Sequence, residues 1–384
     1  MRERGRGRAE VEADLRAARA RDATFASGRI LGSMCTEPHP VAAEAYRIFL
    51  ETNLGDPHLC PGTRDLEQRA LAALGALFGA PPAARGVFVT GGSEANFTGL
   101  LACSRKRAGR EVVLPESAHF SFDKAVHYLR LRANVARVGH DGRVDVDDVR
   151  ERIGPDTCAV VALAGSTELG VVDPVPEMAA MCRDLGVPLH VDAAFGGFVV
   201  PFAKRLGLPF PDFDLRLPGV TTLCADPHKM GLAPIPTGVL FARDAADLDA
   251  LSVPSPYVSV ERQPTLQGTR PGAAPAATWA VLEHLGIEGY TRIVADCLRV
   301  RDHLVEGLTR LGFPPVMPPP LNVVAFRVDD PVESRKALRE AGFLVSLAPM
   351  SRGLKVVVMP HVTRAAVDAF LDALPRCARP AEAA

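Results

Sequence analysis

The most informative part of the chain is residues 189–230, which opens with LHVDAAFGG at Leu189 and closes with TTLCADPHKM at Met230. Both quoted stretches begin as short apolar runs that end in an acid, Asp192 in the first and Asp226 in the second. Such runs are typical of strands that are buried on both faces of a parallel sheet. Ligands of these sheets bind beyond the carboxyl ends of the strands, so the residues that follow each run are the first candidates for chemistry.

Similar apolar runs alternate with segments of helical spacing between about Val87 and Phe241. This alternation predicts an α/β domain built on a parallel or mostly parallel sheet. The expected strands are Val87–Thr90, Val112–Leu114, Ala159–Leu163, Leu189–Asp192 and Thr221–Ala225, and the expected helices between them include Phe97–Ala108 and Val175–Leu185.

The C-terminal part of the chain has a different pattern. A proline-rich loop from Val253 to Gly272 precedes two expected helices, and the break Pro314–Pro320 precedes a smaller α+β unit. The elements expected there are helices Ala276–Leu285 and Tyr290–Leu311, strand Val323–Val328, helix Val332–Ala341, strand Leu354–Met359, and helix Arg364–Leu374 with Thr363 as its N-cap. We therefore expect an N-terminal segment over residues 1–60 that begins as a flexible arginine-rich tail, a large α/β domain over residues 61–312, and a small α+β domain over residues 313–384.

Composition narrows the classes of function. The 384 residues carry 44 Lys and Arg against 45 Asp and Glu, and a chain with this net charge of −1 is not expected to coat nucleic acid. No apolar run approaches the roughly 20 residues that span a bilayer, and no apolar segment of a secretory signal follows the arginine-rich N-terminus. The eight cysteines are scattered without a C-x-x-C pair, which favours reduced thiols. We expect a cytoplasmic protein without a membrane or nucleic-acid partner.

Lysine is rare in this chain, with only six among the 44 basic residues. A lysine in an arginine-rich protein suggests chemistry that needs an amine able to lose its proton. Lys229 follows an expected strand in the sequence Asp226-Pro-His-Lys229, where its amine could form an imine with a carbonyl cofactor. The alternative is an ordinary charge at the rim of the sheet.

Three other strand ends carry candidate side chains. The stretch Thr90-Gly-Gly-Ser-Glu-Ala-Asn96 opens a helix whose free N–H groups could bind a phosphate, although it could also be a plain tight turn. Asp192 could pair with a buried cation or serve only as a helix N-cap. His119 could stack on an aromatic ring or only fill space in the core.

Together these groups match the needs of one cofactor. An anion cradle, a histidine, a carboxylate and an amine each follow a different strand of the same expected sheet. They are the parts that hold pyridoxal phosphate, with its phosphate on the helix start, its protonated pyridine nitrogen beside Asp192 and its aldehyde on Lys229. With that nitrogen protonated, the ring can accept the electron pair left when a bond to the substrate Cα breaks.

Seven motifs support this interpretation and occur in order along nearly the whole chain. They are Ser27–Pro40 (SGRILGSMCTEPHP), Asn53–His58 (NLGDPH), Thr90–Asn96 (TGGSEAN), His190–Gly197 (HVDAAFGG), Asp226–Met230 (DPHKM), Gly268–Gly272 (GTRPG) and Met359–Thr363 (MPHVT). In these motifs the chain resembles the fold-type I pyridoxal-phosphate enzymes, among them the group II amino-acid decarboxylases, and most of all the archaeal L-tyrosine/L-aspartate decarboxylase family. The resemblance implies an aspartate-aminotransferase-like fold, in which a large α/β domain with a mostly parallel sheet carries a smaller C-terminal α+β domain.

The resemblance also implies roles for individual residues. It implies that Lys229 carries the cofactor aldehyde, that Asp192 pairs with the pyridine nitrogen, and that the ring lies between His119 and Ala194. The other residues implied to bind the cofactor are Gly92 and Ser93 at the phosphate, Thr167 near the ring oxygen or Asp192, His228 beside the lysine, and Asp226. The candidate catalytic residues are accordingly Lys229, Asp192, His119 and His228, and no metal ligand is expected.

Three further implications concern the substrate and the subunits. A mobile-loop tyrosine returns the proton to Cα in similar enzymes, and Tyr257 is the candidate here, with a packed loop aromatic as the alternative. Related decarboxylases have an arginine on the strand where this chain has Lys355, and Arg352 lies three residues earlier, so either cation could hold the substrate carboxylate. The resemblance further implies a homodimer with shared active sites, to which the N-terminal segment contributes and in which Gly268 and Thr269 reach the phosphate bound by the partner.

The implied function is decarboxylation of a small-molecule substrate, an L-amino acid. L-tyrosine would give tyramine and L-aspartate would give β-alanine, which would feed methanofuran and coenzyme A synthesis in an archaeon. Glutamate decarboxylation and carbon–carbon cleavage of the sphingosine-phosphate lyase type are alternatives with the same cofactor. From other classes, a metal hydrolase could use the cluster His119, His190, Asp192, Asp226 and His228, although no H-E-x-x-H helix supports it. A catalytically inactive scaffold is disfavoured, since no part of the cofactor site is missing.

Overall fold

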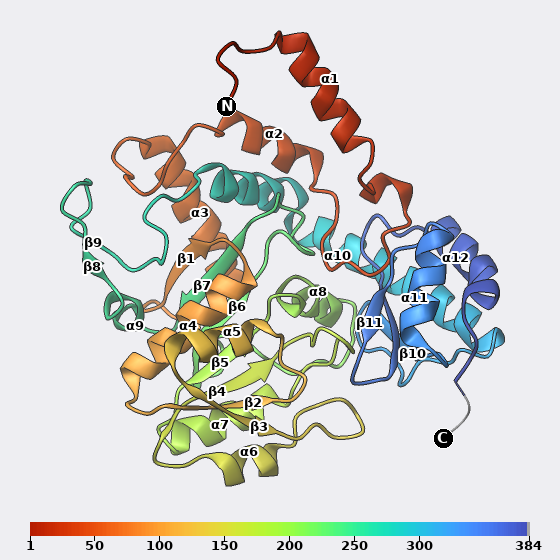
Figure 1. The fold of residues 1–384 in the computed structure, drawn as a ribbon. Coiled ribbons are helices and arrows are strands. Elements are labelled where there is room, and N and C mark those ends of the chain that lie inside the picture. Colours follow the sequence, from red (N-terminus) through yellow and green to blue (C-terminus); the bar gives the residue numbers. More distant parts are fainter. Residues whose placement is uncertain (382–384) are drawn as a thin grey trace.

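The computed structural model describes residues 1–381, which form a large sheet between two layers of helices and a smaller sheet with helices of its own (Figure 1). The strands of the large sheet are β1 (Arg85–Val89), β2 (Glu111–Pro115), β3 (Arg132–Ala136), β4 (Thr157–Leu163), β5 (Leu189–Asp192), β6 (Val220–Ala225) and β7 (Gly238–Ala242). Their order is β1-β7-β6-β5-β4-β2-β3, in which β7 runs antiparallel to both its neighbours and the other strands run parallel to one another. The expected α/β fold with a mostly parallel sheet is confirmed.

Helices cover both faces of this sheet. They are α3 (Pro61–Leu77), α4 (Gly92–Lys106), α5 (Ser121–Leu129), α6 (Val146–Arg152), α7 (Val175–Asp184), α8 (Val200–Arg205) and α9 (Ala245–Asp249), with a short 3-10 turn at Gly196–Phe198. Strand β4 is buried along its whole length, and its successive side chains enter two different cores. Val160 belongs to the core that contains Met178 of α7, whereas Val161 belongs to the core that contains Leu100 of α4. This is the alternation that a strand covered on both faces requires.

The C-terminal sheet is antiparallel and three-stranded, with β12 (Gly353–Val357) between β10 (Val323–Arg327) and β11 (Ser346–Ala348). Helices α11 (Pro331–Glu340) and α12 (Arg364–Cys377) pack beside it, and Thr363 caps α12 by accepting a hydrogen bond from Ala366 N. The two helices expected before this unit form one long element, α10 (Ala273–Arg310), with a kink at Gly286, whose φ of 55° and ψ of −170° are not helical. The expected strands and helices are therefore present here, and β11 was missed.

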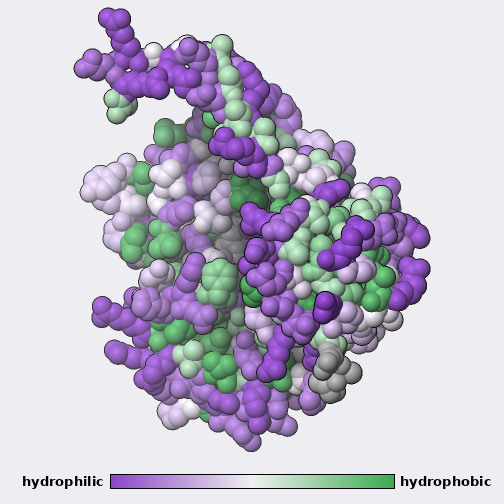
Figure 2. Space-filling view, turned by 45° about the vertical axis from the view of Figure 1, so that its right-hand side comes forward, coloured by the Kyte–Doolittle hydropathy of each residue, from purple (hydrophilic) through white to green (hydrophobic). Residues whose placement is uncertain are grey.

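The N-terminal segment connects the two sheets. It contains α1 (Arg8–Arg19), a 3-10 turn at Phe25–Ser27, and α2 (Pro40–Ile48), which packs against α10. Leu31 N donates to Leu344 O at 2.8 Å, so the segment lies along the small sheet before it returns to the large one. Helix α1 buries no residue and projects from the body as a mostly hydrophilic arm (Figure 2). No helix within residues 1–381 combines the length and the apolar character needed to cross a bilayer.

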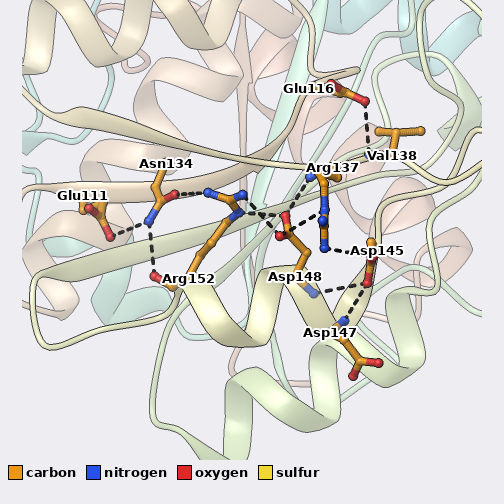
Figure 3. A network of polar contacts seen from close by, with 9 residues as sticks. All are labelled: Glu111, Glu116, Asn134, Arg137, Val138, Asp145, Asp147, Asp148 and Arg152. Carbon is orange, nitrogen blue, oxygen red and sulfur yellow. Dashed lines mark hydrogen bonds and ion pairs between the residues drawn. The ribbon is translucent and has the colours of Figure 1, made fainter.

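The buried strand β7 was absent from the sequence prediction, and so was β3, whose environment explains why. It is an edge strand with exposed residues at Arg132 and Ala133, so it lacks the apolar run that marks a buried strand. A polar network fixes β3 to α6 instead (Figure 3). Arg152 Nη1 donates to Asn134 Oδ1 at 2.8 Å, and Arg152 Nε donates to Asp148 Oδ2 at 2.7 Å. The proline-rich stretch that was expected to be a loop also contains two short strands that the sequence did not predict. They are β8 (Val253–Pro254) and β9 (Arg262–Gln263), which pair as a hairpin.

Candidate active site

A cavity of roughly 370 Å³ lies at the carboxyl ends of β1, β2, β4, β5 and β6, where the sequence predicted the site. The small sheet contributes β12 to its wall and the N-terminal segment contributes Met34. The lining residues are Met34, Thr90, Gly91, Gly92, Ser93, Asn96, Ser117, His119, Leu163, Gly165, Ser166, Thr167, Asp192, Ala194, Phe195, Asp226, His228, Lys229 and Lys355. The cavity therefore brings together residues from positions 34 to 355 of the chain.

The turn into α4 forms an open anion cradle. Gly91 has a φ of 125°, which favours glycine, and a Cβ on Gly92 would lie 2.9 Å from Asp226 Oδ2 and 3.1 Å from the Ala194 Cβ. No side chain caps the N-terminus of α4, since its N-cap residue is Gly91, and Glu94 accepts a hydrogen bond from Thr90 N at 2.8 Å, before the helix. The N–H groups at the helix start therefore remain available for an anion.

Asp192 ends β5 and is almost fully buried. Its carboxylate accepts hydrogen bonds from Asn96 Nδ2 at 2.9 Å and from Ala194 N at 3.0 Å. Burial opposes its ionisation, but the charge of Lys229 and these hydrogen bonds outweigh burial and hold the pKa of Asp192 below its ordinary value. A carboxylate kept charged in a buried place can stabilise a cation such as a protonated ring nitrogen.

Lys229 follows β6 and points into the same cavity. Its Nζ lies 3.0 Å from Asp226 Oδ2, and His228 Nε2 lies 3.9 Å from the same oxygen. His228 Nδ1 contacts the carbonyl of Thr237 at 2.5 Å, which fixes its ring against the turn. The lysine amine and the Nε2 edge of His228 therefore lie near Asp226, beside the anion cradle.

His119 follows β2 and also lines the cavity. Ser121 holds its ring through the hydroxyl, 2.9 Å from His119 Nδ1, and through the backbone N–H, 3.2 Å from the same nitrogen. Burial lowers the pKa of His119, so the ring is neutral at neutral pH. A flat group could lie between this ring and Ala194, which lines the cavity as well.

The small sheet supplies a buried cation. Lys355 of β12 is 6% exposed, and its Nζ donates to Thr167 O at 2.8 Å. Burial lowers the pKa of Lys355 to about 8. The neighbouring Glu168 accepts hydrogen bonds from Ser351 N and Ser351 Oγ, each at 2.6 Å, so Ser351 is a partner of its carboxylate.

Four predicted site residues lie outside this cavity. Tyr257 is 94% exposed in the loop between β8 and β9. Arg352 is exposed in the turn before β12, with a φ of 50°. Gly268 lies against Gly55 instead, and Thr269 follows it in the chain.

Several lining residues were not singled out from the sequence, including Asn96, Ser117 and Phe195. Asn96 belongs to the TGGSEAN motif, but nothing in the sequence distinguished it there, and only the structure shows it buried one turn into α4. The metal-hydrolase interpretation finds no support, since the residues from 1 to 381 contain no group of three His, Cys, Asp or Glu side chains that could hold a metal ion. His190 instead bonds to Thr222 and Asn96.

The donor set fits pyridoxal phosphate. The open cradle at Gly92 and Ser93 suits a phosphate, and the charged Asp192 suits a protonated ring nitrogen. Two buried oxygens in this part of the molecule, Asp226 Oδ1 and Ser117 Oγ, have no hydrogen-bond partner within residues 1–381. Both residues line the cavity, so a polar ligand bound there can supply the partners that these oxygens lack.

Comparisons with known proteins agree with this geometry. The family described as pyridoxal-dependent decarboxylase conserved domain matches residues 39–329. A probable L-tyrosine/L-aspartate decarboxylase of Methanothermobacter thermautotrophicus is 47% identical over 91% of this chain and 97% of that protein. An L-aspartate/L-glutamate decarboxylase of Pyrococcus horikoshii is 43% identical over 92% of this chain and 93% of its own. Among solved structures, sphingosine-1-phosphate lyase of Burkholderia pseudomallei superposes with a TM-score of 0.90 at 29% identity, covering 98% of this chain and 92% of that one.

Proposed function

Because the chain belongs to the pyridoxal-dependent decarboxylase family, we propose that its cavity decarboxylates L-tyrosine to tyramine, L-aspartate to β-alanine, or both. The chain is a carboxy-lyase that depends on pyridoxal phosphate and acts on an amino acid. The observation that carries the proposal is the convergence of the Lys229 amine, the Asp192 carboxylate and the open α4 N-terminus on one cavity. The bound cofactor supplies an electron sink for the bond that breaks at Cα.

Each residue predicted to bind the cofactor within this cavity has a proposed task. Lys229 holds its aldehyde, and Asp192 keeps its ring nitrogen protonated because the carboxylate is charged and buried. His119 and Ala194 lie on the two faces of the ring. Gly92 and Ser93 bind the phosphate through the start of α4, which has no side-chain cap. Asp226, His228 and Thr167 complete the wall of the cavity around the ring.

Lys355 is the proposed anchor of the substrate carboxylate. It lines the cavity, whereas Arg352 is exposed in the preceding turn, so the geometry favours the lysine of the two candidates. Its ammonium is held by the carbonyl of Thr167. A cation at this wall can hold a carboxylate away from the ring plane, and its burial strengthens the attraction.

The remaining proposals need a second subunit. Tyr257 is exposed within one subunit, and Gly268 and Thr269 lie outside its cavity. We place these residues at the active site of the partner in a homodimer, where Tyr257 would donate a proton to Cα and Gly268 and Thr269 would contact the phosphate. We also propose that the enzyme works in the cytoplasm, where β-alanine would serve coenzyme A synthesis and tyramine would serve methanofuran synthesis.

Purified protein provides the test. We expect a yellow protein that releases carbon dioxide and the amine from tyrosine or aspartate, and steady-state rates on tyrosine, aspartate and glutamate side by side identify the substrate. Borohydride should fix the cofactor on Lys229 and should fail to do so in Lys229→Ala. Release of an aldehyde in place of carbon dioxide would show a carbon–carbon lyase and would refute the decarboxylase proposal.

A further inference from the structure

Asn96 is the centre of a buried hydrogen-bond network behind the cavity. It lies on α4 and is 1% exposed. Its Nδ2 donates to Asp192 Oδ2 at 2.9 Å and to Ser121 Oγ at 3.0 Å. Its Oδ1 accepts from His190 Nε2 at 2.9 Å and from Cys224 Sγ at 3.1 Å. Each side of the amide therefore has two partners, and no donor or acceptor is left over.

The charge of Asp192 fixes the orientation of this amide. A charged carboxylate only accepts hydrogen bonds, so the NH₂ group of Asn96 must face it. The amide oxygen then faces His190 Nε2, which must carry the proton. His190 Nδ1 is left to accept from Thr222 Oγ1, 2.9 Å away. Burial lowers the pKa of His190, which agrees with a neutral ring. Each group therefore donates a hydrogen bond to the next: Thr222 to His190, His190 to Asn96, and Asn96 to Asp192.

A second branch reaches the other face of the cofactor site. Ser121 Oγ accepts from Asn96, so its own proton is free for His119 Nδ1, 2.9 Å away. The backbone N–H of Ser121 points at the same nitrogen. His119 Nδ1 is therefore an acceptor, and the proton of the neutral ring is on Nε2. The amide of Asn96 therefore fixes the hydrogen bonding of Asp192 at the end of β5 and, through Ser121, of His119 after β2.

We propose that Asn96 is a positioning residue that holds Asp192 as a carboxylate and fixes His119 as its Nε2–H tautomer through the two hydrogen bonds it donates. This inference rests on the proposed function, in which Asp192 and His119 contact the cofactor ring. Asn96 itself acts through these two residues. Its replacement should therefore change cofactor binding in a way that depends on pH, which simple loosening of the core would not do.

The first measurement is the dissociation constant for pyridoxal phosphate, obtained by absorbance titration of cofactor-free protein at several pH values. Asn96→Asp keeps the size of the side chain but sets two acids against each other in a buried place, so one must hold a proton. We expect affinity at neutral pH to fall at least about ten-fold, equivalent to ~1.4 kcal/mol. We also expect the pH below which affinity is lost to rise, because Asp192 becomes harder to ionise.

Asn96→Leu tests the same point without adding an acid. It removes both donors, so affinity should also fall at least about ten-fold. This variant keeps the proposal testable if Asn96→Asp does not fold. Ser121→Ala is the matched control, since it cuts only the branch to His119. We expect it to keep the pH dependence of cofactor affinity but to change the ring-nitrogen resonances of His119 in spectra of isotope-labelled histidine.

Asp192→Asn separates this inference from the proposed function. If Asp192→Asn loses affinity while both Asn96 variants keep wild-type affinity and pH dependence, the role of Asn96 is wrong and the proposed function stands. If Asp192→Asn binds the cofactor as tightly as wild type, the assignment of Asp192 fails, and the inference built on it fails too. Loss of affinity in Asp192→Asn and in both Asn96 variants, with a raised pH midpoint in Asn96→Asp, supports the proposal.

Discussion

The amine of Lys229 lies 3.0 Å from Asp226 Oδ2, and the other oxygen of that carboxylate is buried without a hydrogen-bond partner among residues 1–381. Burial alone would lower the pKa of Lys229, but Asp226 and Asp192 outweigh it and raise the pKa. The lysine is therefore held as a cation in the cofactor-free protein. Because an aldehyde reacts with the unprotonated amine, Asp226 shifts cofactor attachment to higher pH by raising this pKa.

Asp226→Asn should therefore shift the attachment reaction. The variant keeps the shape of the side chain but removes its charge, so the pKa of Lys229 should fall. Attachment of pyridoxal phosphate should then reach its maximal rate at lower pH than in wild type. Stopped-flow absorbance over a range of pH measures this rate.

The matched control for this prediction is Asp247→Asn. Asp247 is also a buried acid with one unpartnered oxygen, and it pairs with Lys106 at 2.6 Å, outside the cavity. We expect this variant to leave the pH dependence of attachment unchanged. An equal shift in both variants would mean that Asp226 acts only through the overall charge of the protein.

Gly92→Ala should weaken cofactor binding. The added Cβ would lie 2.9 Å from Asp226 Oδ2 and 3.1 Å from the Ala194 Cβ, so the cradle or Ala194 must shift. We expect the dissociation constant for pyridoxal phosphate to rise at least about ten-fold, or ~1.4 kcal/mol. Gly62→Ala is the control because a Cβ there meets nothing within 4 Å. Wild-type affinity in Gly92→Ala would show that the phosphate does not lie at this turn.

Lys355 should make substrate binding depend on pH. Its pKa of about 8 means that the cation is complete below this pH and is lost as the pH rises through it. We therefore expect KM to rise above about pH 8 with a smaller change in kcat. Steady-state rates at several pH values, with saturating cofactor, measure both constants.

Lys355→Arg provides the comparison, since arginine keeps its charge to much higher pH. The rise of KM above about pH 8 should then disappear, even if KM itself is larger because the two cations differ in shape. Lys355→Met should raise KM throughout. A pH profile that is identical in wild type and Lys355→Arg would remove Lys355 as the carboxylate anchor.

The sequence predicted the centre of the site because parallel strands end at one edge of a sheet. Asp192, Lys229 and His119 each follow a strand, so their convergence needed only the order of the strands to be parallel. The choice between Arg352 and Lys355 could not be made in the same way. It depends on the left-handed turn at Arg352, which directs that residue to solvent and leaves Lys355 on the buried strand.

The role of Asn96 was also beyond the sequence. Its four partners come from α5, β5 and β6, and only the packing of α4 on the sheet brings them together. Strand β3 was missed for a related reason, since an exposed edge strand has no apolar run to mark it. The buried strand β7 was missed as well, so local pattern identified most of the buried strands of the large sheet but not all of them. Contacts between elements require the folded chain.

Tyr290→Phe should destabilise the turn that follows the active-site lysine. Tyr290 of α10 is 2% exposed, and its hydroxyl donates to Gly231 O at 2.8 Å. Burial raises the pKa of Tyr290, so the hydroxyl stays a donor at all ordinary pH values. The variant leaves the carbonyl of Gly231 buried without this partner, which should lower the free energy of unfolding by about 1–3 kcal/mol.

Thr291→Val removes a hydroxyl one position further along α10 and serves as the control. Thr291 Oγ1 donates to Ile287 O at 2.7 Å on an exposed face, where water can replace it. Its loss should change the free energy of unfolding by less than about 0.5 kcal/mol. Denaturant unfolding of the cofactor-free proteins measures both values. Because Gly231 lies two residues after Lys229, Tyr290→Phe should also weaken cofactor binding, and an unchanged stability would show that the buried carbonyl finds another partner.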